Sequence, residues 1–255
     1  MLKLAESNDL KSILSFCDGN LLGTRISCYC LAYGFDRDFI NIWVDKSEDV
    51  IKTVVAKFYD SMTVITSSDN VDEIKEFISM MGFASLETDA IICTKLGFKA
   101  DSVKKAYVFN GKAENFGAED LGEEHYKELY NLVSENISGS FINSKEAYLS
   151  FISDFTFRKH RSLARCKGFI ENDKLFSSVI TSAETETCAL LSAVASDISV
   201  RGKGYGKKTV LSMVDELLKE NKKVFVIALN ESAESFYEHL GFDIYGEIAF
   251  INNSQ

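Results

Sequence analysis

The chain has 255 residues, a formal net charge of −10, and 46% hydrophobic residues. This composition predicts a folded protein of one large or two ordinary domains, and it argues against disorder and against sequence-independent nucleic-acid binding. No apolar run approaches the roughly 18 residues of a membrane span, and the N-terminus lacks the charged-then-apolar layout of a signal peptide.

The cysteines indicate a reducing compartment. None of the six cysteines shows Cys-x-x-Cys spacing, and the three histidines are scattered, so no metal site is predicted. Buried free thiols in the cytoplasm are the expectation.

The first half of the chain mixes helical and strand patterns. Apolar residues at helical spacing predict helices over residues 8–17, 21–33 and 71–81. Strands are predicted over 39–44, 62–66 and 89–95, whereas 50–59 carries both helical and β-branched signals and stays open between the two.

A polar stretch with scattered glycines, residues 97–117, separates the two halves around one probable strand at 106–109. We therefore expect two domains, 1–110 and 111–255. The second should contain helices over 123–137, 144–159, 207–220 and 232–240. Its expected strands are a hairpin (162–170 and 175–182), then 187–200, 223–229 and a final pair within 242–251.

An internal repeat indicates a duplication. The order strand, helix, Gly-Phe, strand occurs at 63–94 and again at 224–251, which pairs Phe77-Ile78 with Phe236-Tyr237. The glycines of the first half are isolated, so only the second copy is expected to retain a glycine-rich loop.

That loop is Arg201-Gly202-Lys203-Gly204-Tyr205-Gly206, between a predicted strand and the helix that begins at Lys207. Glycines let the backbone approach a ligand closely, and the first turn of a helix presents unpaired N–H groups and about half a positive charge. Four of the eight residues from Arg201 to Lys208 are basic in an otherwise acidic chain. The segment predicts an anion site, most simply for phosphate.

Two common phosphate loops do not fit this spacing. A dinucleotide fingerprint starting at Gly202 would need glycine or alanine where Lys207 stands. A P-loop ending at Gly206-Lys207 would need glycine in place of Arg201 and serine or threonine in place of Lys208.

The spacing of Arg201, Gly204 and Gly206 instead resembles the Arg/Gln-x-x-Gly-x-Gly/Ala signature of the GCN5-related N-acetyltransferase (GNAT) superfamily. The segment from Asn230 to Phe242 resembles a second motif of the family, with Phe236-Tyr237 and Gly241-Phe242 at the expected spacing. The resemblance covers about residues 115–255 and extends weakly to the first half. It implies an α+β (α/β) fold, a GNAT-like mixed twisted sheet flanked by helices, in tandem, with a degenerate and non-catalytic first copy.

The resemblance also implies acetyl-coenzyme A as cosubstrate. Backbone amides from Gly202 to Lys207, with Lys203 and Tyr205 between the glycines, would then hold the pyrophosphate. Val194 and Ala195 would pair through their backbones with the pantetheine arm, and Asn230 would contact the cosubstrate.

Tyr237 is similar to the general acid of the family, since a phenol and a thiol have comparable pKa values. Its alternative role is that of a core aromatic residue, because it shares a helical face with Ala233, Phe236 and Leu240. No general base is evident.

Residues 188–196 contain no carboxylate, and the flanking Glu184, Glu186 and Asp197 are expected to be solvated charges. A water relay could take the place of a carboxylate base.

Two functions follow from these patterns. The first is an N-acetyltransferase in which the primary amine of a small molecule attacks acetyl-CoA directly, without nucleic-acid or membrane partners and with a homodimer left open. The second is an acyl-CoA-binding sensor without turnover, in which the first half is an interaction module. The missing carboxylate and the degenerate first copy motivate this second hypothesis.

Overall fold

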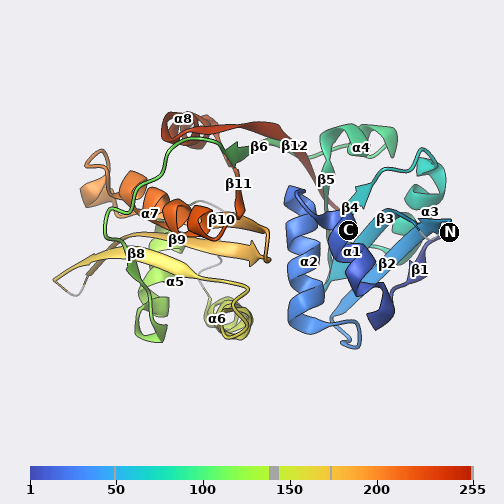
Figure 1. Ribbon diagram of the computed structural model, residues 1–255, viewed down its shortest axis with the longest axis horizontal. Coiled ribbons are helices and arrows are strands. Elements are labelled where there is room, and N and C mark those ends of the chain that lie inside the picture. The colour runs from blue at the N-terminus through green and yellow to red at the C-terminus, as the bar shows by residue number, and fades with distance from the viewer. Residues whose placement is uncertain (49, 138–143, 173, 254–255) are drawn as a thin grey trace. The chain divides into compact units, whose positions relative to one another are not determined.

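The computed structural model describes residues 1–48, 50–137, 144–172 and 174–253, which form two compact units (Figure 1). Unit 1 comprises Met1–Tyr107, Ile227–Ser235 and Ile244–Gln255, and unit 2 comprises Val108–Val226 and Phe236–Asp243. The first boundary between the units, at Tyr107–Val108, lies close to the predicted residue 110. Two later segments of the chain, however, belong to unit 1.

Unit 1 is built on a mixed sheet with the strand order β1-β2-β3-β4-β5-β12. All pairs are antiparallel except β4 with β5, which run parallel. Its strands are β1 (Lys3–Leu4), β2 (Ile40–Ser47), β3 (Val50–Phe58), β4 (Ser61–Thr66), β5 (Ser85–Asp89), and parts of β6 (Ser102–Phe109) and β12 (Phe242–Asn252). Its helices are η1 (Ser7–Asp9), α1 (Leu10–Cys17), α2 (Leu21–Tyr33), α3 (Val71–Met81) and α4 (Ala90–Lys95).

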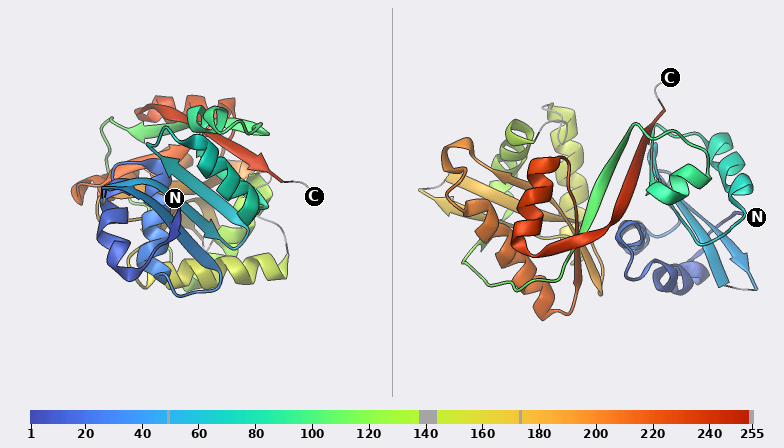
Figure 2. Two further views of the ribbon diagram at one scale, coloured as in Figure 1. Left: turned by 90° about the vertical axis from the view of Figure 1, so that its right-hand side faces the viewer. Right: turned by 90° about the horizontal axis from the view of Figure 1, so that it is seen from above.

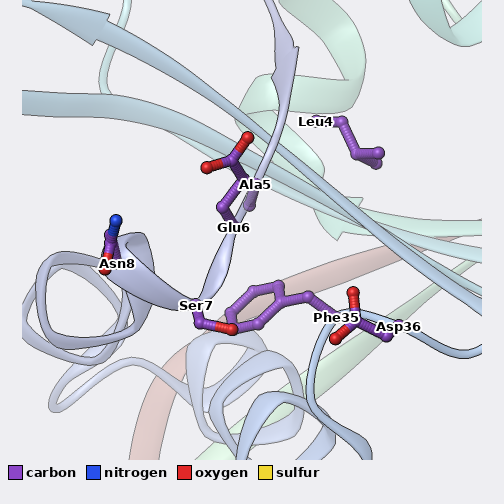
Figure 3. Close-up of a pocket in the computed structure, with 7 residues that line it drawn as sticks. All are labelled: Leu4, Ala5, Glu6, Ser7, Asn8, Phe35 and Asp36. Atoms are coloured by element: carbon purple, nitrogen blue, oxygen red, sulfur yellow. The ribbon is translucent and has the colours of Figure 1, made fainter.

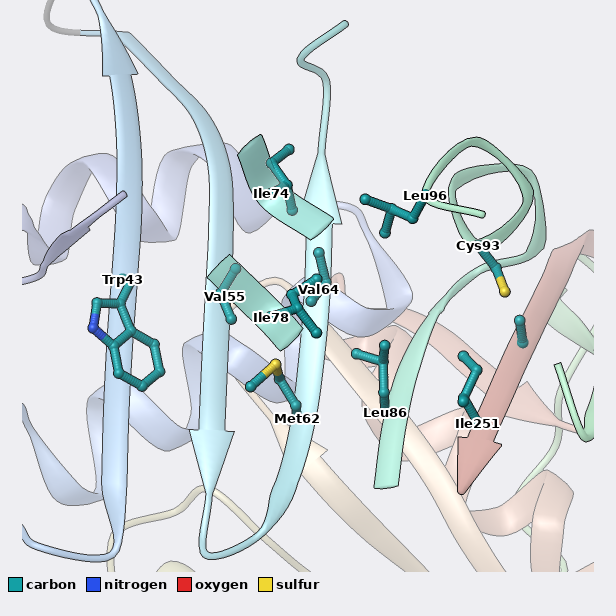
Figure 4. Close-up of a cluster of buried hydrophobic side chains, with 11 residues drawn as sticks. Trp43, Val55, Met62, Val64, Ile74, Ile78, Leu86, Cys93, Leu96 and Ile251 are labelled. Carbon is teal, nitrogen blue, oxygen red and sulfur yellow. The ribbon is translucent and has the colours of Figure 1, made fainter. Parts of the chain in front are cut away.

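The core of unit 1 includes residues from the C-terminal strand. Ile74 and Ile78 of α3 pack on the sheet, and Ala249 and Ile251 of β12 complete the same cluster (Figure 4). The pairing of β12 with β5 runs from Ile248–Asp89 to Asn252–Ser85. The last strand of the chain is therefore part of the fold of the first unit.

Unit 2 contains the strand order β11-β10-β9-β8-β7, antiparallel except for the parallel pair β10–β11. Its strands are β7 (Glu119–Asp120), β8 (Cys166–Glu171), β9 (Lys174–Glu184), β10 (Cys188–Ser196) and most of β11 (Lys223–Ile227). Its helices are η2 (Glu123–His125), α5 (Tyr126–Asn136), α6 (Lys145–Lys159), η3 (Ile198–Val200), α7 (Tyr205–Lys219) and the second half of α8 (Glu231–Leu240). Figure 2 shows α5 and α6 on one face of this sheet and α7 on the other. The predicted fold class, a mixed sheet flanked by helices, is confirmed.

Four local predictions need correction or completion. The strand predicted over 187–200 is β10, which ends at Ser196, and the short helix η3 follows at Ile198–Val200. Residues 89–95 are not a strand, because the Asp89 carboxylate accepts hydrogen bonds from the Ile91 and Ile92 amides and starts helix α4 instead. The final strand pair is the single strand β12, and the ambiguous segment 50–59 is strand β3. Of the predicted hairpin turn, Asp173 lies outside the described residues.

The repeat is real in topology, but its predicted alignment is shifted. In each unit an antiparallel hairpin is followed by a strand, a helix and a parallel strand, which equates β4-α3-β5 with β10-α7-β11. The sequence Leu96-Gly97-Phe98 then corresponds to Leu240-Gly241-Phe242, and both glycines have positive φ, at 69° and 96°. Cys93, not Ile78, is thus the counterpart of Tyr237. The tripeptide Leu-Gly-Phe, identical in the two copies, could have revealed this alignment from the sequence.

Candidate functional site

The two parallel strands of unit 2 separate before the first one ends. Pairing of β10 with β11 stops at Leu191–Val226, whereas β10 continues to Ser196. A bulge between Ser192 and Ala195 holds Ala193 at φ +48°, and Ser178 Oγ donates a hydrogen bond of 3.1 Å to the Ala193 carbonyl. The predicted pantetheine contacts, Val194 and Ala195, lie in this segment, where the edge of β10 beyond Leu191 offers backbone groups to an extended ligand.

The chain leaves β10 through a tightly held turn. The Asp197 carboxylate accepts hydrogen bonds from the Ser199 amide (2.9 Å) and hydroxyl (2.5 Å), which caps the short helix η3. The same carboxylate forms an ion pair with Lys174, and these interactions lower the Asp197 pKa. The first residue of the turn, Asp197, is therefore held in place by its side-chain contacts.

The glycine loop follows, and it needs its glycines. Gly202 and Gly204 have φ values of 76° and 85°, which side chains other than glycine rarely adopt. A Cβ atom at Gly206 would lie 3.0 Å from Ser196 Oγ, so this glycine permits close packing of α7 against the end of β10. At each of these three positions, backbone conformation or close packing therefore requires glycine.

The loop presents amides and positive charge together. Gly204 is the N-cap of α7 and supplies no side-chain cap. Among hydrogen bonds of the described chain, none uses the amides of Tyr205, Gly206 or Lys207 as donors. Lys203 and Lys207 are exposed, as is Arg201, whose Nη2 donates to Asn136 Oδ1 at 2.9 Å. This is the arrangement that binds an anion at a helix N-terminus.

Tyr237 is a buried residue of unit 2, 6% exposed. Its ring contacts Phe236 (5.3 Å between centroids) and Phe242 (5.5 Å). Burial raises the pKa of its phenol well above the ordinary value. The group therefore keeps its proton at neutral pH, as a general acid must, but the same aromatic contacts fit a core residue.

Asn230 caps helix α8. Its Oδ1 accepts a hydrogen bond of 3.0 Å from the Ala233 amide. Asn230 is grouped with unit 1, whereas the glycine loop and Tyr237 belong to unit 2. Within unit 2, the structure brings Gly206 to 3.8 Å from the Phe236 ring, measured from the position of a Cβ atom.

The flanking carboxylates differ from expectation in two cases. Asp197, whose side chain is 19% exposed, is bound by Lys174 and Ser199. Glu184 is not a solvated charge: it is fully buried and accepts hydrogen bonds from Lys222 Nζ (2.5 Å), Thr181 Oγ1 (3.0 Å) and the guanidinium of Arg165. Tertiary packing of β9 against α7 and the following turn supplies these partners, which the local sequence does not reveal. Glu186 is exposed.

Two residues at the tip of the β8–β9 hairpin were not predicted. Glu171 accepts a hydrogen bond from the Tyr205 phenol, and Lys174 pairs with Asp197. No local signal marks them, since each contacts a segment more than 20 residues away along the chain.

The described residues of unit 1 lack the features of the anion site. Ser67-Ser68-Asp69-Asn70, between β4 and α3, contains no glycine, and Asp72 and Glu73 follow in the first turn of the helix. A shallow hollow of about 430 Å³ elsewhere in this unit is lined by Leu4, Ala5, Glu6, Ser7, Asn8, Phe35 and Asp36 (Figure 3). Its charged residues, Glu6 and Asp36, are both acidic and would repel a phosphate.

No cluster of candidate metal ligands occurs among the described residues. In the same part of the chain, no helix has both the length and the apolar composition needed to cross a bilayer.

Comparisons with known proteins agree with this architecture. The family model described as FR47-like protein matches residues 168–251. A tandem GNAT protein from the clavulanic acid biosynthesis pathway, solved without AcCoA, has a TM-score of 0.63 at 12% identity over 98% of this chain and 97% of that one. An acetyltransferase of the GNAT family from Colwellia psychrerythraea has a TM-score of 0.59 at 13% identity, with 99% of each chain covered.

A Drosophila protein has a TM-score of 0.67 at 13% identity, again over 99% of each chain. Comparison with curated proteins finds no sequence match. The predicted resemblance and its tandem arrangement are confirmed at the level of the fold.

Proposed function

We propose that this protein is an N-acetyltransferase that transfers the acetyl group of acetyl-CoA to the primary amine of a small molecule. The observation that carries the proposal is the glycine loop, with free amides at Tyr205, Gly206 and Lys207 beside the edge of β10 that β11 leaves unpaired. The GNAT fold of the solved neighbours supports it.

The residues of unit 2 fit acetyl-CoA as cosubstrate. The amides of the first turn of α7 and the charges of Arg201, Lys203 and Lys207 would hold the pyrophosphate, and the backbone of Val194 and Ala195 would orient the pantetheine arm. The thioester supplies the acetyl group when the cosubstrate is bound. Asn230 is proposed as a further contact, through the part of its amide that α8 does not use.

Tyr237 is proposed as the general acid. As the amine forms its bond to the carbonyl carbon and the carbon–sulfur bond breaks, the departing sulfur takes the phenolic proton. Burial raises the pKa of the phenol, so the group is protonated at neutral pH but is a weaker acid than a solvent-exposed tyrosine. The amine must lose its own proton to water, since Glu184 is already bound to Arg165 and Lys222.

Calorimetric titration of acetyl-CoA tests the binding step. We expect binding by the wild type and none by Gly204→Glu, which strains a residue at φ +85° and adds a negative charge to the anion site. Gly246→Ala is the control, since a Cβ atom there meets no atom within 4 Å. A wild type that does not bind acetyl-CoA would refute the proposal.

An acyl-CoA sensor without turnover is the second candidate, favoured by the commitment of Glu184 to an ion-pair cluster and by the core contacts of Tyr237. Thiol release with a panel of amines separates the two. We expect turnover that falls about 100-fold or more in Tyr237→Phe, the usual contribution of a general acid. Binding without turnover for any amine would favour the sensor.

We place the protein in the cytoplasm as part of this proposal. All six cysteines are free and buried, which agrees with a reducing compartment.

A further inference from the structure

The tip of the β8–β9 hairpin contacts both ends of the segment that contains the glycine loop. Glu171 and Lys174 are the last cross-strand pair of this hairpin. Glu171 contacts Tyr205, where α7 begins, and Lys174 contacts Asp197, where β10 has ended. One structural element thus bridges the two ends of the loop.

At the helix end, the side chain of Tyr205 makes the contacts that matter here. Its phenol donates a hydrogen bond of 2.6 Å to Glu171 Oε1. Its ring lies 5.8 Å from Phe169 on β8 and 5.9 Å from Phe176 on β9, measured between centroids. These contacts fix the first residue of α7, which presents one of the three free amides beside those of Gly206 and Lys207.

At the strand end, the Lys174 ammonium lies 2.7 Å from Asp197 Oδ2 and 5.2 Å from the centroid of the Phe176 ring. Asp197 in turn holds the amide and hydroxyl of Ser199. Phe176 therefore contacts residues at both ends of the loop segment, Lys174 at the strand end and Tyr205 at the helix end.

Between these two anchors lie Gly202 and Gly204, at whose Cβ positions no atom is found within 4 Å. Glycines without packing contacts have many accessible conformations, and ordering them on ligand binding costs free energy. Anchors at both ends reduce that cost before the ligand arrives.

We propose that the β8–β9 hairpin tip is a clamp in which Glu171 and Lys174 preorganise the glycine loop for the pyrophosphate of acyl-CoA. Glu171, Lys174, Tyr205 and Asp197 are then positioning residues for the cosubstrate. This inference rests on the proposed function, because it assumes that the loop binds acyl-CoA.

The clamp contributes little to global stability. Lys174 is 55% exposed, and ion pairs and hydrogen bonds at such sites are screened by solvent. A loss of clamping should therefore appear in ligand affinity and in loop motion, not in the melting temperature.

The test uses the full chain and three variants: Tyr205→Phe, which keeps the ring and removes the hydrogen bond, Lys174→Met, which removes the ion pair, and Asp197→Asn. We expect CoA affinity to fall about 3- to 10-fold in each single variant, the usual effect of one lost hydrogen bond. Amide hydrogen exchange of residues 198–207 in the ligand-free protein should accelerate, with an unchanged melting temperature.

Lys219→Met is the matched control. Lys219 forms an ion pair of 2.6 Å with Asp215 near the other end of α7 and is also exposed. CoA affinity and exchange in the loop should match the wild type in this variant.

Asp197→Asn separates clamping from simple charge attraction. Asparagine can still accept the hydrogen bonds from Ser199, but it frees Lys174 and removes a negative charge. Direct attraction of phosphate by Lys174 predicts tighter CoA binding in this variant, whereas the clamp predicts weaker binding. Tighter binding, or unchanged loop exchange in Tyr205→Phe and Lys174→Met, would overturn the clamp alone. A wild type that does not bind CoA would overturn the proposed function and the clamp with it.

Discussion

Glu184 shows how a buried carboxylate can hold several elements of unit 2 together through ion pairs. Its carboxylate is fully buried between Arg165 and Lys222, and Arg165 also contacts Glu216 and Glu220. Burying a charge is costly, and its partners offset that cost only while all of them are present. The cluster joins β9, α7 and the turn that follows α7.

Glu184→Gln should therefore lower the free energy of unfolding by about 3 kcal/mol. The substitution removes the buried negative charge that offsets the desolvation of the Lys222 and Arg165 cations. Urea denaturation measures this change, and the exposed Glu186→Gln is the control. Equal stability of the two variants would contradict the role of Glu184.

The same cluster predicts a pH dependence. The hydrogen bond from Arg165 lowers the pKa of Glu220 from 4.5 to about 2. A lowered pKa in the folded state means that the stabilisation is complete above pH 4.5 and is lost as the pH falls toward 2.

Glu220→Gln should be less stable than the wild type at pH 7, by no more than about 1 kcal/mol because the side chain is partly exposed. The difference should shrink below pH 4.5 and vanish near pH 2. Urea unfolding at a series of pH values measures it, and a difference that stays constant down to pH 2 would contradict the assignment.

At the scale of elements, caps decide where helices begin. Asp89 starts α4 where the apolar alternation predicted a strand, whereas the spacing of apolar residues alone correctly predicted α3 over Val71–Met81. α4 has only six residues, too few for helical periodicity to outweigh the β-branched Ile91 and Ile92. Asn230 performs the same task for α8.

Asn230→Ala should lower the free energy of unfolding by about 1 kcal/mol, because the cap on the Ala233 amide is lost. Asn230→Asp retains an acceptor and should restore most of that stability. If Asn230 also contacts acetyl-CoA, as we propose, both variants should bind it more weakly. Wild-type affinity in Asn230→Asp would leave Asn230 as a cap alone.

At the scale of the molecule, unit 1 depends on the end of the chain. Ile248, Ala249 and Ile251 of β12 are buried, and β12 covers the edge of β5. A chain without this strand would expose both an apolar cluster and a row of unpaired backbone groups.

Truncation after Glu247 should therefore lower the melting temperature and make residues 1–107 sensitive to limited proteolysis. Truncation after Asn253 is the control and should behave as the full chain. Unit 1 would be independent of β12 if both truncated forms resisted protease equally.

The sequence by itself determined the local features: most helices, the hairpin, the tandem organisation and the glycine loop. These depend on apolar periodicity and on the backbone freedom of Gly202 and Gly204, which neighbouring residues decide. Only the tertiary structure decided that β12 pairs with β5, that Glu184 is buried in ion pairs, and that Glu171 and Lys174 reach the loop. These contacts join segments far apart in the chain, and no local pattern encodes the strand order that brings them together.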